Sequence, residues 1–87
     1  LGSLYGSQGE FDRAEGMFNK ALALNTEMES KEGMAIQFFN LGLLYEQHGD
    51  GERAREAWNK ALVLFKEVGI PDKIEQVQGL LAGLDSG

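Results

Sequence analysis

The sequence LGLLYEQHGDGERAREAWNKALVL, residues 41–64, decides the fold, because its pattern occurs twice in the chain. The earlier copy, LGSLYGSQGEFDRAEGMFNKALAL, spans residues 1–24 and lies 40 positions upstream. An internal repeat of this length is typical of a solenoid, in which each unit buries its apolar face by stacking on the next unit. Two random segments of this composition would share about 2 or 3 residues over such an alignment. Residues 1–40 and 41–80 share thirteen: Leu1/Leu41, Gly2/Gly42, Leu4/Leu44, Tyr5/Tyr45, Gly9/Gly49, Arg13/Arg53, Ala14/Ala54, Asn19/Asn59, Lys20/Lys60, Ala21/Ala61, Leu22/Leu62, Leu24/Leu64 and Glu27/Glu67.

Each copy predicts a helix, a tight turn and a second helix. In the first copy we expect the back half of a helix over 1–8, ended by Gly9 with a positive φ angle, which glycine adopts without steric cost. A second helix is expected over 11–28, because its apolar residues recur at helical spacing. Ala14 and Ala21 predict a close crossing of two helix axes, since a larger side chain there would push the axes apart.

The second copy predicts helices over 31–48 and 51–68. Ser30 and Asp50 are suitable N-caps for these helices. Gly42 falls inside the first of them, where an exposed glycine would cost about 1 kcal/mol relative to alanine. We therefore interpret Gly42 as a point of close approach between helices.

A fifth helix is predicted over 72–84, after a stop signal at residues 69–71. Asp72 and Glu75 have the spacing of a capping box, and the preceding proline suits a helix start. One side of this helix is polar, as a terminal capping helix requires. Its other side carries an apolar stripe at helical spacing: Ile74, Val77, Leu80, Leu81 and Leu84.

These residues resemble the signature of the tetratricopeptide repeat (TPR) family: Leu-Gly, Tyr, a turn glycine, Ala, an aromatic residue and Ala-Leu. The second copy matches with Leu41-Gly42, Tyr45, Gly49, Ala54, Trp58 and Ala61-Leu62. The first copy matches with Leu1-Gly2, Tyr5, Gly9, Ala14, Phe18 and Ala21-Leu22. The family's usual period is about 34 residues, so a period of 40 resembles a subgroup with longer helices. Phe18 and Trp58 share one position, and we expect both to be core wedges between helices.

The resemblance implies an all-α fold of about five helices, in which antiparallel helix-turn-helix repeats stack as a right-handed α-solenoid. We expect one TPR-like domain over residues 1–87. It would consist of a partial first repeat over 1–28, a second repeat over 30–68 and a C-terminal capping helix over 72–84. Because residue 1 falls in the middle of a repeat helix, we interpret the chain as a fragment of a larger repeat protein.

Composition argues against several classes of partner. The 87 residues carry a net charge of −6, whereas nucleic acids and anionic membranes require a basic surface. Cysteine is absent, and no apolar run approaches the ~18 residues of a membrane span. No signal peptide is visible, and we expect a cytoplasmic protein.

The sequence contains no set of residues for catalysis. The single histidine, His48, has Gln47 and Gly49 as neighbours, and we interpret it as a solvated side chain at a helix end. The carboxylates are scattered over surface positions, whereas general acid–base catalysis needs two of them in one dry pocket. We therefore expect no enzyme activity, no metal and no cofactor.

A more specific candidate for a functional site is a binding surface on the helix predicted over 31–48. In TPR proteins such helices line a concave groove that holds peptides, and in the longer-helix subgroup an Asn before Leu-Gly, here Asn40, commonly holds the ligand backbone. An amide both donates and accepts hydrogen bonds, so it can bind a peptide bond. We expect neither Lys nor Arg on this surface, which argues against a clamp for a C-terminal carboxylate. The groove face, as we name it, comprises Ile36, Phe39, Asn40, Leu43, Glu46 and Gln47.

The function predicted from this face is binding a peptide or helix of a partner protein, with a neutral or basic and partly apolar ligand favoured. Two alternatives remain for its apolar residues. Phe39 and Leu43 pack within the chain against the first or fifth helix, or they pack against a second copy of the chain. The alternative functions are accordingly a scaffold that self-associates as a homo-oligomer, or a regulatory arm of a larger multidomain protein.

Overall fold

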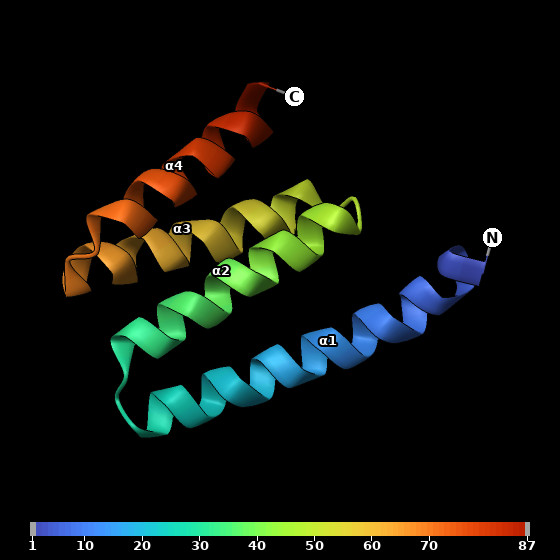
Figure 1. Cartoon of the computed structure of the whole chain (residues 1–87), viewed down its shortest axis with the longest axis horizontal. Coiled ribbons are helices and arrows are strands. Elements are labelled where there is room, and N and C mark those ends of the chain that lie inside the picture. The colour runs from blue at the N-terminus through green and yellow to red at the C-terminus, as the bar shows by residue number, and fades with distance from the viewer. Residues whose placement is uncertain (1, 87) are drawn as a thin grey trace.

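The computed structural model describes the backbone of residues 2–86 and the side chains of residues 9–84. This part of the chain is all α-helical. Helices that follow one another in sequence pack side by side, with α1 along α2 and α4 along α3 (Figure 1). The extents are 42 × 34 × 18 Å, and the shortest is below two helix diameters, so the helices keep a face open to solvent. The helices are α1 (Gly2–Glu27), α2 (Lys31–Gln47), α3 (Gly51–Val68) and α4 (Pro71–Ser86).

The helices of the second copy follow the sequence prediction closely. The bounds of α3 are those predicted, and α2 ends at Gln47, one residue early. The Ser30 hydroxyl accepts a hydrogen bond from the Gly33 N–H at 3.2 Å. The Asp50 carboxylate accepts one from the Arg53 N–H at 3.2 Å. Both predicted N-caps are therefore confirmed.

The turn predicted at Gly9 is wrong, because α1 runs through this residue without a break. Four helices therefore form where about five were expected. At the same place in the second copy, Gly49 has a φ of +86° and Asp50 caps the next helix. The first copy has Glu10 in place of Asp50, and glutamate is not among the residues that cap helices well. A glycine without a capping side chain beside it does not end the helix here.

The turn between α1 and α2 shows the same geometry as the turn forty residues later. Glu29 adopts a left-handed φ of 56°, where the second copy has a glycine with a φ of 84°. The Ser30 N–H donates to the Asn25 carbonyl at 2.8 Å, and the Ile70 N–H donates to the Phe65 carbonyl at 3.1 Å. The repeat thus imposes this turn even where a glutamate must adopt a conformation that costs an L-residue roughly 1–2 kcal/mol.

The core lies between α2 and α3 and extends to α4. Trp58 is fully buried, and its indole Nε1–H donates a hydrogen bond to the Phe39 carbonyl at 3.1 Å. Ala54 and Ala61 are fully buried beside it, whereas Ala14 and Ala21, where the sequence predicted a close crossing of helices, are only half-buried. Phe18, the counterpart of Trp58 on α1, is only half-buried. The other buried apolar residues are Ala35, Leu41, Ala57, Phe65 and Val77.

Gly42 lies directly against Trp58. A Cβ atom at Gly42 would clash with the indole ring, which confirms the close approach that the sequence predicted. The glycine is therefore required by the space that the ring occupies.

We expect Gly9→Ala to stabilise the fold by about 0.5–1 kcal/mol, because alanine is favoured over glycine inside a helix. A Cβ at Gly9 would meet nothing within 4 Å. Gly49→Ala should instead destabilise the fold by roughly 1–2 kcal/mol, because its φ is positive. Urea denaturation followed by circular dichroism measures both free energies of unfolding. Loss of stability in both variants would contradict a continuous α1.

We expect Gly42→Ala to destabilise the fold by about 1–3 kcal/mol, the usual cost of overpacking a core. Gly79→Ala on α4 is the matched control, since a Cβ there would meet nothing within 4 Å. Its free energy of unfolding should rise by up to about 1 kcal/mol. Equal responses in the two variants would show that the Trp58 contact does not limit the space at Gly42.

Candidate functional site

All residues of the predicted groove face lie on α2, but they differ in depth. Three are exposed: Ile36, Glu46 and Gln47. Three are half-buried: Phe39, Asn40 and Leu43. The face therefore combines apolar side chains of intermediate depth with polar side chains at its C-terminal end.

Two apolar residues of the face also serve the core. Phe39 and Leu43 pack against the buried cluster around Trp58. The Lys73 ammonium of α4 lies 5.4 Å from the centre of the Phe39 ring, a cation–π distance. The sequence analysis was wrong to expect neither lysine nor arginine here, because the packing of α4 carries Lys73 to the edge of the face. A single lysine still differs from the set of basic residues that grips a carboxylate.

Asn40 is the polar group in the middle of the face. Its side chain makes no hydrogen bond to the residues that the structure describes. It is half-buried, and its neighbours one turn away on α2 are Ile36 and Leu43. An amide in such a place can donate to and accept from one peptide bond of a ligand.

Two surface hollows lie where α1 meets its neighbouring helices. The larger, of about 370 Å³, lies between α1, α2 and α3 and is lined by Asn19, Leu22, Phe38, Leu41, Tyr45, Arg53, Glu56, Ala57 and Lys60. The smaller, of about 300 Å³, lies between α1 and α2 and is lined by Glu10, Phe11, Ala14, Leu44, Gln47 and His48. Of the groove-face residues, only Gln47 borders either hollow. The sequence analysis missed both, since each forms where separate helices meet.

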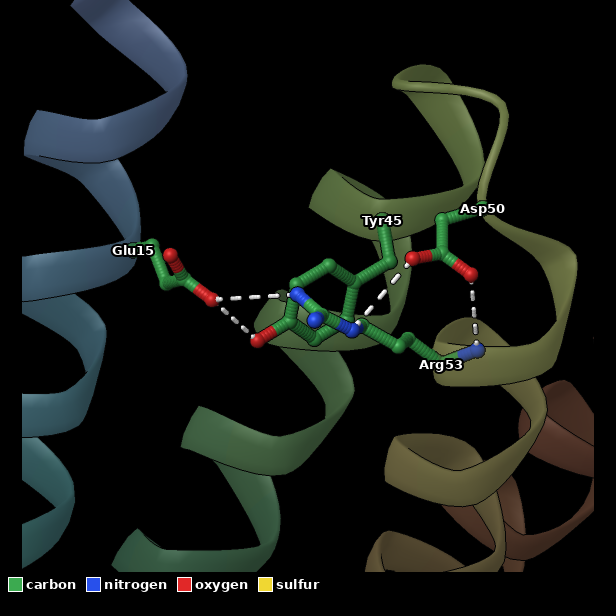
Figure 2. A network of polar contacts seen from close by, with 4 residues as sticks. All are labelled: Glu15, Tyr45, Asp50 and Arg53. Carbon is green, nitrogen blue, oxygen red and sulfur yellow. Dashed lines mark hydrogen bonds and ion pairs between the residues drawn. The ribbon is translucent and has the colours of Figure 1, made fainter.

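A polar network joins α1 to the α2–α3 hairpin, and Figure 2 shows its four side chains. The Tyr45 hydroxyl donates to the Glu15 carboxylate at 2.6 Å. The Arg53 guanidinium lies 4.0 Å from Glu15 and 3.4 Å from Asp50, and 5.7 Å from the centre of the Tyr45 ring. Sequence reasoning missed this network, because Tyr45 and Arg53 are repeated forty residues apart but Glu15 and Asp50 are not.

Burial, and then the hydrogen bond to Glu15, raise the pKa of Tyr45 to about 12. The nearby Glu15 charge contributes to this rise in the pKa, while the Arg53 charge opposes it. The unfolded chain has the ordinary tyrosine pKa of about 10. The protonated phenol therefore stabilises the fold fully below pH 10, and this contribution is lost as the pH rises from about 10 towards 12.

We expect Tyr45→Phe to lower the free energy of unfolding by about 1 kcal/mol near neutral pH, because a partly buried hydrogen bond to a carboxylate is lost. The difference between wild type and variant should shrink above pH 10. A double-mutant cycle with Glu15→Ala, measured by urea denaturation, isolates the pair. Additive effects of the two substitutions would show that the pair does not connect the helices.

His48 is exposed but not isolated. Its ring stacks on Phe11 of α1 with the ring centres 4.0 Å apart and the planes at 18°. The interpretation as a solvated side chain at a helix end is confirmed, since His48 is exposed and caps α2, but the packing of α1 on α2 also brings an aromatic ring beside it. No group of three or more His, Cys, Asp or Glu side chains within the described residues could hold a metal ion. No described helix is both long and apolar enough to cross a membrane.

Two models of the tetratricopeptide repeat family match the chain, one over residues 1–27 and one over residues 35–68. The chain carries two tetratricopeptide repeats. No curated protein and no solved structure matches it. The second match covers α3 and most of α2, which is the helix pair with the tightest packing. The four helices, packed as adjacent pairs, are consistent with TPR helix-turn-helix repeats.

TPR repeats imply a module for protein–protein interaction. Such repeats are typically non-catalytic, and neither match is to a catalytic family.

Proposed function

We propose that the groove face of α2 binds an extended segment of a partner protein. The observation that carries this proposal is the side-chain amide of Asn40, which has no hydrogen-bond partner among the described residues and lies between Ile36 and Leu43. Asn40 would pair with a peptide bond of the ligand, while Ile36 and Leu43 contact its apolar side chains. Such a surface binds the ligand's backbone through a side-chain amide and the ligand's side chains through apolar contacts.

Charge favours a neutral or basic ligand. The chain has a net charge of −6, and Glu46 is exposed at the end of the face. Lys73 is the cation that borders the face, and its ammonium lies over the Phe39 ring. A segment with aliphatic side chains and a basic residue near Glu46 therefore fits best.

The same proposal assigns roles to the rest of the chain. The first repeat would be partial, over residues 1–28, and the second would span residues 30–68. Helix α4 would act as the C-terminal capping helix, because Val77 is buried against α3 while Gln76 and Gln78 are exposed.

We expect Asn40→Ala and Ile36→Glu each to weaken peptide binding about tenfold or more, because each removes or blocks one contact worth at least ~1.4 kcal/mol. The probe is a fluorescent peptide selected on the wild-type chain from a displayed random library, and fluorescence anisotropy measures its affinity. Phe39→Glu is less informative, since Phe39 also packs on the core.

The matched controls are Asn59→Ala and Val63→Glu, which make the same changes at exposed positions of α3. Both should bind the peptide as the wild type does. Unchanged affinity in the α2 variants, or a selection that yields no binding peptide, would overturn the assignment of this face.

A further inference from the structure

Helix α1 lacks a cover that its counterpart α3 has. Ala57 on α3 is 6% exposed, whereas Met17, forty residues earlier on α1, is 64% exposed. Trp58 is fully buried, whereas its counterpart Phe18 is half-buried. The same holds for two alanine pairs, buried on α3 and half-buried on α1: Ala54/Ala14 and Ala61/Ala21. The face of α3 that α2 covers is therefore open on α1.

A hollow continues this open face towards α2. It has a volume of about 300 Å³, and Phe11 and Ala14 of α1 face Leu44 and His48 of α2 across it. Three of the six residues that line this slot between the two helices are apolar, and Met17 lies one turn beyond Ala14 on α1. A helix that lay in this slot would cover the slot and Met17.

The sequence of the missing helix is present in the chain itself. Gly2, Leu4 and Tyr5 repeat residues 42, 44 and 45 of α2, the helix that covers α3. In this structure residues 2–8 are the first turns of α1 and continue straight from Gly9. A segment in line with α1 cannot fold back onto the slot of its own chain, but it can reach the slot of a second copy.

The register of the α2–α3 hairpin fixes how two copies would meet. The contacts Gly42–Trp58, Phe38–Lys60 and Tyr45–Arg53 are all centred on residues 49–50. Forty residues earlier, the same centre falls on residues 9–10, within the uninterrupted part of α1. Two antiparallel α1 helices that cross there place residues 2–8 of each copy against residues 12–18 of the other.

We propose that two copies of this chain form a domain-swapped dimer, in which residues 2–8 of each copy fill the slot of the other. Exchange of an identical element is a low-cost route to a two-fold dimer, since each contact exists twice and repeats one that the fold already makes. The two Glu10 side chains meet near the axis, and each is exposed and free to turn to solvent. This inference goes beyond peptide binding and does not depend on it.

The register also sets the limit of the interface. The exchanged segment reaches Met17 but not Met28, which lies eleven residues further on, in the turn after α1. Val68, the counterpart of Met28, remains 40% exposed in the complete second copy. Met28 is therefore an exposed methionine outside the proposed interface and serves as the control for Met17.

Disulfide formation tests the crossing point. The chain has no cysteine, so Glu10→Cys introduces a single thiol at the proposed axis. Under mild oxidation it should cross-link the two copies, because disulfides form only when the two Cα atoms lie close together. Leu24→Cys should not cross-link. If the two copies instead paired around the exposed side chains Met17, Leu24 and Met28, Leu24→Cys would cross-link and Glu10→Cys would not. That result would overturn the proposal.

Sedimentation velocity across a dilution series tests the interface without cysteines. The wild type should dimerise, and Met17→Glu should weaken the dimer about tenfold or more by burying a charge, while Met28→Glu should leave it unchanged. Circular dichroism checks that each variant keeps its helices. A wild type that is monomeric at every concentration, or equal effects of the two variants, would overturn the proposal.

Discussion

The contact between the Trp58 indole and the backbone of Gly42 is the constraint on which the rest of the packing depends. The ring occupies the space of a side chain at residue 42, so α2 and α3 can approach closely only where one of them has a glycine. Its Nε1–H then satisfies the Phe39 carbonyl, which a buried ring nitrogen requires. The alanines beside the ring, Ala54 and Ala61, are small for the same reason. This helix pair is the unit onto which α1 and α4 pack.

Helices α1 and α4 are held in different ways. Helix α4 buries Val77 completely and places further aliphatic residues against the core. Helix α1 is held largely by contacts that remain partly open to solvent, among them the Tyr45–Glu15 hydrogen bond and the stacking of Phe11 on His48. Exposed polar contacts contribute less to stability than apolar burial and are weakened by salt. The α1 end is therefore the part of the fold that can rearrange at least cost.

The sequence predicted what depends on short-range pattern and failed where a distant contact decides. The bounds of α3, the caps at Ser30 and Asp50, and the burial of Trp58 all follow from spacing and residue type. The turn predicted at Gly9 does not form, because glycine permits a turn but a capping side chain and a covering helix are needed to stabilise it.

The features of the candidate site likewise include some that the sequence predicted and some that it did not. That the groove-face residues share one side of α2 could be predicted from helical periodicity, whereas their burial depends on neighbouring helices. The Glu15–Tyr45 pair and the position of Lys73 beside Phe39 depend on how separate helices lie against one another. The periodicity of a single helix does not show how helices pack against one another, so these contacts could be found only in the structure.

The two ends of the stack differ in what they can bind, and this difference limits assembly. The α4 residues at the positions of Ala35, Phe38 and Phe39 are Glu75, Gln78 and Gly79, all exposed. A further helix would find no apolar side chain at these three positions, so growth at this end is disfavoured. Contacts at the α1 end would be the same patch on both copies, and such two-fold contacts close on themselves. Association through α1 would therefore stop at two copies and would leave the groove face of α2 in each copy uncovered.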